Sequence, residues 1–160
     1  RLAMTPAINF LKQHGVHYQV HAYHHDKSTS AYGLEAVEAL GLHANVVFKT
    51  LVVAIAGKQL AVAVLPVGNT LSMKKLAKAL QVKKVAMAKA QDVERITGFI
   101  LGGVSPMGQK THLPTVLHES ALGLAKMFVS AGKRGLEIEI APNDLHKATA
   151  AIWADIIDVR

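Results

Sequence analysis

A lysine within an apolar segment is the residue of this sequence best suited to chemistry. Lys49 follows Phe48 at the start of a run of β-branched and apolar residues that continues to residue 56. An ammonium group buried without a partner costs several kcal/mol, so we expect Lys49 to face a cavity or an anion. The alternative is a lysine on an edge strand whose side chain points to solvent.

A glycine-rich segment, residues 98–108, is expected to form a shaped loop that supplies backbone donors. Gly102 and Gly103 lack a Cβ, so their N–H groups can approach a ligand closely and form an oxyanion site, although a tight turn would also explain them. The segment partly matches a phosphate-binding P-loop, in which a lysine directly follows the second glycine. Here a glutamine precedes Lys110 and no helix is predicted next, so we reject a nucleotide triphosphatase.

Other reactive constellations are missing or badly spaced. Four histidines lie close together, at His17, His21, His24 and His25. On a strand, residues four apart are separated by about 13 Å, too far for one zinc ion to bridge. The chain has no cysteine, which excludes a thiolate nucleophile, a disulfide and a thiolate zinc site. Composition leaves a serine triad open, but the Gly-x-Ser-x-Gly elbow is absent. We expect no metal and no cofactor.

A basic segment offers a second candidate function. It contains no Asp or Glu, and its lysines are Lys74, Lys75, Lys78, Lys83, Lys84 and Lys89. The formal net charge of +7 favours a polyanionic partner. Aromatic residues make up only 5% of the chain, too few for base-stacking platforms, so we interpret the first five of these lysines as contacts to a nucleic-acid phosphate backbone. A solvated helix face is the alternative.

The composition indicates one globular domain. The chain has 160 residues, of which 51% are hydrophobic and 18% charged, so it can bury a sizeable core. We expect the domain to span residues 4–158, and residues 1–3, which precede Met4, to be a cloning remnant. No segment reaches about 18 uninterrupted apolar residues and no signal peptide is visible, so we expect a soluble, cytoplasmic protein with no membrane partner.

Capping residues and hydrophobic periodicity place the helices that must position these groups. Thr5 and Pro6 begin a first helix, which ends near Gly15. Further helices are predicted over residues 34–40, 72–80 and 91–97, with a closing helix over residues 144–152.

The strands are predicted from apolar runs and turn residues. Residues 47–56 and 59–65 form the clearest β-hairpin, and their continuous hydrophobicity indicates that both faces are covered. Other strands are expected at residues 18–25, around Val85 and three times within residues 115–140. The interleaved elements predict an α+β fold: a single domain with a mixed, mostly antiparallel β-sheet curved into a partly closed barrel with flanking helices.

Three motifs, in order along the chain, resemble those of the YbaK family. They are Phe48-Lys49-Thr50-Leu51, the segment Gly102–Gly108 and the segment Val129–Gly135. The start at Met4–Ala7 and the ending at Glu139–Leu145 are also similar, so the resemblance covers nearly the whole chain. It implies an α+β fold with a mixed sheet curved around a pocket, related to the editing domain inserted in bacterial prolyl-tRNA synthetases.

The resemblance implies the deacylation of cysteinyl-tRNA(Pro), which is the activity of the family. Proline and cysteine are similar in size, and a pocket separates apolar groups that differ by one methylene only about 10- to 200-fold. A synthetase that accepts proline therefore mischarges cysteine, and a second, hydrolytic site removes it. The expected partners are aminoacyl-tRNA and prolyl-tRNA synthetase.

The resemblance also implies roles for individual residues. Lys49 and Gly103 are the expected catalytic residues, with Lys49 also holding the terminal adenosine or its phosphate and the ester. Substrate binding is expected from Tyr23, Tyr32, Lys49, Gly102, Gly103 and Ser130. In the family the cysteinyl thiol attacks its own ester, so the protein only binds, orients and stabilises the oxyanion. Two alternatives stay open: an alanyl-tRNA(Pro) deacylase that uses a bound water, and a non-enzymatic RNA-binding module.

Overall fold

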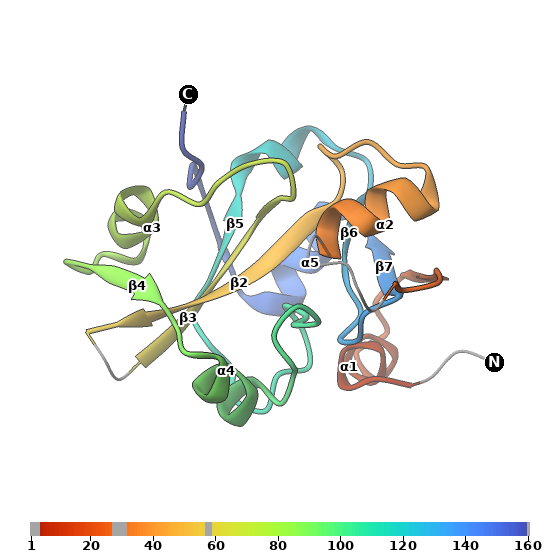
Figure 1. Cartoon of the computed structure of the whole chain (residues 1–160), viewed down its shortest axis with the longest axis horizontal. Helices are drawn as coiled ribbons and strands as arrows, with labels where there is room; N and C mark the ends of the chain where they lie inside the picture. The colour runs from red at the N-terminus through yellow and green to blue at the C-terminus, as the bar shows by residue number, and fades with distance from the viewer. Residues whose placement is uncertain (1–3, 27–31, 57–58, 160) are drawn as a thin grey trace.

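The computed structural model describes residues 4–26, 32–56 and 59–159 (Figure 1). Its helices are α1 (Pro6–Gln13), α2 (Tyr32–Leu40), α3 (Met73–Leu80), α4 (Ala90–Thr97) and α5 (Pro142–Thr149), with a short 3-10 helix, η1 (Glu119–Gly123). Its strands are β1 (Gln19–Ala22), β2 (Phe48–Ile55), β3 (Gln59–Pro66), β4 (Val85–Met87), β5 (Thr115–His118), β6 (Met127–Ser130), β7 (Leu136–Ile140) and β8 (Ile152–Ala154). None of the helices in these ranges is long and apolar enough to cross a membrane.

The strands pair in two sheets, and the mixed α+β class is confirmed. One sheet has the strand order β4-β2-β3-β5-β8 and the other has the order β1-β7-β6. The pairings of β3 with β5 and of β5 with β8 are parallel, and the other pairings are antiparallel. The described strands form no closed barrel, so that part of the prediction is not confirmed.

Strand β2 connects the two sheets and leaves part of one edge open. Val47, directly before β2, forms a bridge with Phe128 of β6. At the other end, β4 pairs with the last three residues of β2, and the Ala88 N–H donates to the Val52 C=O at 3.1 Å. Between these two contacts no described strand lies on this side of β2. The gap is the place where a ligand can reach the strand.

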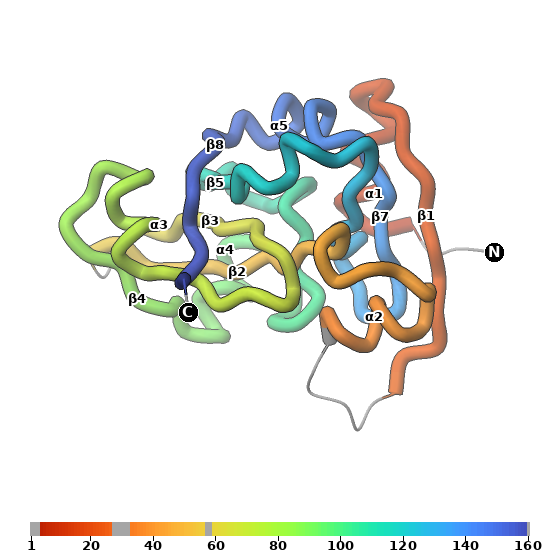
Figure 2. The backbone as a smooth tube through the Cα atoms, turned by 90° about the horizontal axis from the view of Figure 1, so that it is seen from above, coloured from red at the N-terminus to blue at the C-terminus, as the bar shows by residue number. Residues whose placement is uncertain are grey.

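Apolar side chains cover both faces of β2 and β3, as their continuous hydrophobicity predicts. On one face Val53 belongs to a buried cluster with Leu76 of α3. On the other face Val52 belongs to a larger cluster with Val93 of α4. Figure 2 shows α3 and β4 at one end of the molecule, with α1, β1 and β7 at the other. The open part of β2 lies between these two ends.

The closing helix differs from its prediction. Helix α5 ends at Thr149 because Ala150 adopts the left-handed conformation, with φ of 51°, and its N–H donates to the Lys147 C=O. Residues 152–154 then form β8, which pairs in parallel with β5. The apolar residues that extend the helical pattern therefore belong to a strand. Local periodicity alone does not distinguish these two cases for so short a run.

Candidate active site

A cavity of about 420 Å³ opens beside the unpaired edge of β2. This volume lies within the range of about 300–1,000 Å³ that is typical of small-molecule sites. The residues that line it come from both sheets, from α2 and from the glycine-rich loop: Tyr23, Gly33, Leu34, Phe48, Lys49, Thr50, Leu51, Val52, Val67, Met87, Leu101, Gly102, Val104, Ser130, Lys133, Arg134 and Glu137.

The open edge of β2 presents backbone groups to this cavity. In an antiparallel pair, alternate residues direct their N–H and C=O groups to opposite edges of the strand. The Val52 C=O accepts from Ala88 on the side away from β3. The backbone groups of Phe48 and Thr50 therefore point to the same side, where the cavity lies. The Thr50 hydroxyl is also buried and has no hydrogen-bond partner among the described residues.

Lys49 lies in this stretch of β2, and its half-buried side chain lines the cavity. Its Nζ lies 3.5 Å from the Val67 C=O, and no carboxylate oxygen of the described residues lies within 4.0 Å of it. Burial lowers the pKa of Lys49, because the charged form loses hydration and no described carboxylate compensates for it. An anionic ligand would supply the missing interaction.

Glu137 of β7 is an acid in the same cavity. The residue is 7% exposed, and burial raises its pKa to about 8. At neutral pH its carboxyl group therefore carries a proton in the free protein. Pairing places it opposite His21 of β1 and Ser130 of β6. A protonated acid can donate a hydrogen bond, and an approaching cation would favour its ionised form.

Tyr23 directly follows β1 and is held beside β7. Its N–H donates to the Gly135 C=O at 2.9 Å. Gly135 has φ of 90°, and a Cβ there would lie 3.0 Å from the Tyr23 carbonyl oxygen, so the close approach requires glycine. Burial, and secondly the charge of Glu137, raise the pKa of Tyr23 to about 12. The phenol is therefore a hydrogen-bond donor at neutral pH.

The two glycines of the loop have different positions. Gly102, with φ of 89°, lines the cavity, and no described residue accepts a hydrogen bond from its N–H. Gly103 is not among the lining residues, and its N–H donates to the Ile100 C=O at 2.9 Å. The N–H of Gly103 is thus used in a turn. Gly102 has the available donor.

Ser130 ends β6 at the cavity. Its Oγ accepts a hydrogen bond from the Gly132 N–H at 3.0 Å, which stabilises the turn before β7. No histidine is among the lining residues, so the cavity itself contains no histidine base beside this hydroxyl. Ser130 is therefore positioned to hold a ligand through hydrogen bonds. Tyr32 is the first residue of α2, and its side chain lies outside the part of the chain that is described.

Two of the four clustered histidines, His21 and His25, pair with carboxylates. His21 Nε2 lies 2.8 Å from Glu139 Oε1, and His25 Nδ1 lies 2.7 Å from Glu35 Oε1. Within the described ranges, no group of three His, Cys, Asp or Glu side chains could hold a metal ion. Glu35 also accepts from the Asp26 N–H at 2.7 Å, which attaches the end of this segment to α2 beside the cavity.

The predicted RNA-binding lysines lie around α3 and the turn before β4. One of them has a structural partner: Lys75 Nζ donates to Asp155 Oδ2 and to the Ile157 C=O, both at 2.8 Å. These bonds attach the C-terminal segment to α3. Binding of tRNA by this segment stays a prediction for Lys74, Lys75, Lys78, Lys83 and Lys84.

Sequence reasoning missed Glu137 and the hydroxyl of Thr50. The signal for Glu137 was present, because in the strand Leu136–Ile140 apolar and acidic residues alternate and the acids share one face. An acidic residue on a strand is usually exposed, so this pattern by itself does not indicate a buried acid. In the folded protein Glu137 is buried and lines the cavity.

Comparison with known proteins agrees with this geometry. Residues 27–148 match the aminoacyl-tRNA editing domain. A protein of Enterococcus faecalis (strain ATCC 700802 / V583), named "Putative Cys-tRNA(Pro)/Cys-tRNA(Cys) deacylase EbsC", is 41% identical over 95% of this chain and 92% of its own length.

Two solved structures show the same fold. A protein described in its crystal structure as "a putative trans-editing enzyme for prolyl tRNA synthetase" superposes with a TM-score of 0.84 at 25% identity, covering 98% of this chain and all of the other. A scaffold from a study of epitope grafting by computational design superposes with a TM-score of 0.86 at 24% identity, over 97% of this chain and 96% of its own, and shows the fold alone. With its match over residues 27–148 and its relative of 41% identity, the chain belongs to the family of aminoacyl-tRNA editing domains.

Proposed function

We propose that this protein hydrolyses mischarged cysteinyl-tRNA(Pro), acting in the cytoplasm beside prolyl-tRNA synthetase. The main observation behind this proposal is that one cavity is lined by Lys49, by Gly102 and by the buried acid Glu137, and that no described carboxylate pairs with Lys49. A cation and an N–H donor suit an ester whose carbonyl oxygen becomes negative. The family and the name of the E. faecalis relative support an aminoacyl ester as the substrate.

The two ionisable groups, Lys49 and Glu137, suit opposite ends of an aminoacyl ester. Lys49 would hold the developing oxyanion or a phosphate of the terminal nucleotide. Glu137 would hold the α-amino group of the amino acid, and its proton would leave when a substrate ammonium group binds, because a nearby cation favours the carboxylate. Tyr23 and Ser130 would contact the adenosine, as the family resemblance implies.

The substrate supplies the nucleophile in this proposal. The cysteinyl thiol loses its proton, and the sulfur attacks the ester carbonyl carbon. A C–S bond forms and the C–O bond to the ribose breaks. The ribose oxygen accepts a proton, and the amino acid leaves as a thiolactone that water later opens. Lys49 and the Gly102 N–H stabilise the negative oxygen of the intermediate.

The high effective concentration of an intramolecular thiol makes this route fast enough to replace attack by a protein nucleophile. A free thiol has a pKa of about 8.5, so a few per cent is thiolate near neutral pH. Groups held in good geometry reach effective molarities of about 10⁵ M or more. A serine hydroxyl of the same geometry is far less acidic, and an alanyl side chain has no nucleophile. The mechanism therefore also selects the substrate.

A panel of esters tests the proposal. Transfer RNA(Pro) charged with Cys, Ala, Ser or Pro is incubated with the protein, and the remaining ester is measured over time. We expect rapid loss of the cysteinyl ester alone. Two controls are matched to the thiol: the S-methylcysteinyl ester keeps the sulfur and removes the thiol proton, at the cost of one added methyl group, and the seryl ester keeps the number of side-chain heavy atoms. Rapid hydrolysis of the S-methyl or alanyl ester would refute thiol participation and indicate an activated water.

A further inference from the structure

We infer that the outer edge of β4 binds the single-stranded RNA that precedes the nucleotide in the cavity. The strip consists of Lys84, Met87 and Lys89, and it leads across the edge of the five-stranded sheet to the cavity mouth. The inference rests on the proposed function, since it supposes that an acylated RNA end occupies the cavity. It adds the path of the next nucleotides, which the cavity alone does not define.

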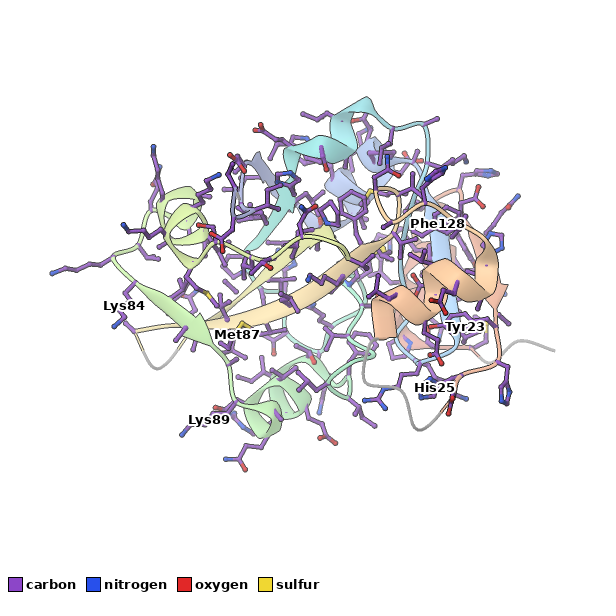
Figure 3. All side chains as sticks on the ribbon, turned by 45° about the horizontal axis from the view of Figure 1, so that its top comes forward. Tyr23, His25, Lys84, Met87, Lys89 and Phe128 are labelled. Carbon is purple, nitrogen blue, oxygen red and sulfur yellow. The ribbon has the colours of Figure 1, made fainter. Side chains whose placement is uncertain are left out.

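The geometry of the strip is set by β4. This strand is the outermost of its sheet, and Met87 pairs with Val53 at the end of the open part of β2. Met87 lines the cavity and is 48% exposed. Lys84 and Lys89 are both exposed, and Figure 3 shows Lys84 to the left of Met87 and Lys89 below it, at the β4 end of the molecule. Along the chain, the cation Lys84 directly precedes β4, the apolar Met87 ends it, and the cation Lys89 follows two residues later.

The small volume of the cavity places the nucleotides that precede the acylated nucleoside outside it. A volume of about 420 Å³ lies near the lower end of the range for small-molecule sites, which suits a single acylated nucleoside. The phosphate on the 5′ side of that nucleoside must therefore lie at the mouth. Met87, Leu101, Lys133 and Arg134 line the cavity, and Met87 and Leu101 are each 48% exposed.

The charge of the surroundings favours RNA over an ordinary protein partner. Residues 39–91 contain no Asp or Glu, so β4 and the chain directly before and after it carry only basic charges as far as Asp92 on α4. No carboxylate oxygen of the described residues lies within 4.0 Å of the ammonium group of Lys84 or Lys89. Lysines contact phosphates without regard to sequence, and an exposed methionine can contact the face of any base. This suits the end of a tRNA.

Comparing two substrates with the same reacting end distinguishes the contribution of the strip from that of the cavity. One is cysteinyl-tRNA, and the other is the cysteinyl ester of adenosine, which has no phosphate. The variant is Lys84→Gln/Lys89→Gln, whose two positions do not line the cavity. The matched control is Lys126→Gln/Lys147→Gln, which removes two exposed lysines before β6 and on α5.

We expect the Lys84/Lys89 variant to raise KM for cysteinyl-tRNA about fivefold or more with kcat unchanged. The slope of log KM against log salt should fall by about 1.4, at about 0.7 per phosphate contact of a single strand. The adenosine ester should show neither change, and the control variant should match wild type on both substrates. An unchanged KM and slope for cysteinyl-tRNA, or an equal loss on the adenosine ester, would overturn the inference.

A binding measurement keeps this test separate from the proposed function. A fluorescent single-stranded RNA ending in CCA is titrated with wild type and with the Lys84/Lys89 variant. Weaker binding by the variant, with a smaller salt slope, supports the strip even if wild type cleaves neither ester. Equal binding by both proteins refutes the strip even if deacylation is rapid, and would leave these lysines to a protein partner.

Discussion

The carboxyl group of Glu137 allows the cavity to be tested without any substrate. Burial raises its pKa from 4.5 to about 8, so the folded protein keeps a proton that the unfolded chain releases. Between these two values the folded state binds more protons than the unfolded state. The contribution of Glu137 to the free energy of unfolding is therefore greatest below pH 4.5, decreases as the pH rises and becomes constant above about pH 8.

The size of this effect follows from the two pKa values. One pKa unit corresponds to about 1.4 kcal/mol, so the difference between 4.5 and about 8 corresponds to about 5 kcal/mol. Only 7% of the residue is exposed, so solvent screening reduces the effect little. Glu137→Gln keeps the shape and cannot ionise. The variant should be more stable than wild type by about 3 kcal/mol at pH 7 and about 5 kcal/mol at pH 9, but by only about 1 kcal/mol at pH 5.

Urea unfolding followed by circular dichroism at these three pH values measures the difference directly. Other titrating groups are present in both proteins, so their contributions cancel when the two free energies are subtracted. Glu94→Gln, on the exposed face of α4, controls for the loss of one acidic side chain. A difference between wild type and Glu137→Gln that stays constant from pH 5 to pH 9 would show that Glu137 is not a buried neutral acid.

Three further perturbations test single groups. Lys49→Met should lower the rate of deacylation about 100-fold or more with an unchanged circular dichroism spectrum, and activity within a few-fold of wild type would remove Lys49 from the site. Gly102→Ala should slow deacylation at least tenfold, because a φ of 89° is strained for alanine. Gly103→Ala should not slow it, because the added Cβ would meet its neighbours only at 3.5 Å. Equal rates for the two variants would exclude the Gly102 N–H as a donor to the oxyanion. Burial lowers the pKa of His118, and its Nδ1 accepts a hydrogen bond from the Ile156 N–H at 3.2 Å, so the neutral ring is favoured in the folded state. Below about pH 6.5 the unfolded chain therefore binds more protons than the folded protein, and the free energy of unfolding should decrease. Thermal unfolding at pH 5 and 7.5 should show a smaller decrease for His118→Asn, and an identical decrease would contradict this assignment.

The sequence was sufficient where the signal was local. The first helix begins as predicted, with the Thr5 hydroxyl accepting from the Ile8 N–H at 3.1 Å. The hairpin of β2 and β3 follows from its apolar runs and short turn. Lys49 could be selected as a cavity residue because a cation in an apolar strand is costly unless something accommodates it. Each inference used residues that are close together in the chain.

The rest of the site depends on contacts between distant segments. The open edge of β2 exists because β6 contacts the strand at Val47 and β4 pairs only with its last three residues. Nothing within residues 47–56 indicates where those partners begin and end. The burial of Glu137 likewise depends on the cavity, which residues from both sheets, α2 and the glycine-rich loop line. Sequence patterns report neither pairing register nor burial of a polar side chain.

The charges of the empty cavity connect its stability to its function. Burial lowers the pKa of Lys49 and raises that of Glu137, so each group is shifted toward its neutral form. A ligand with an ammonium group and a developing oxyanion would reverse both pKa shifts. The two buried groups lower the stability of the protein without such a ligand, and their charged forms favour this ligand over uncharged ones. Glu137→Gln should then be more stable at pH 7 and also less active on cysteinyl-tRNA. A gain of stability without any loss of activity would mean that Glu137 does not contact the substrate.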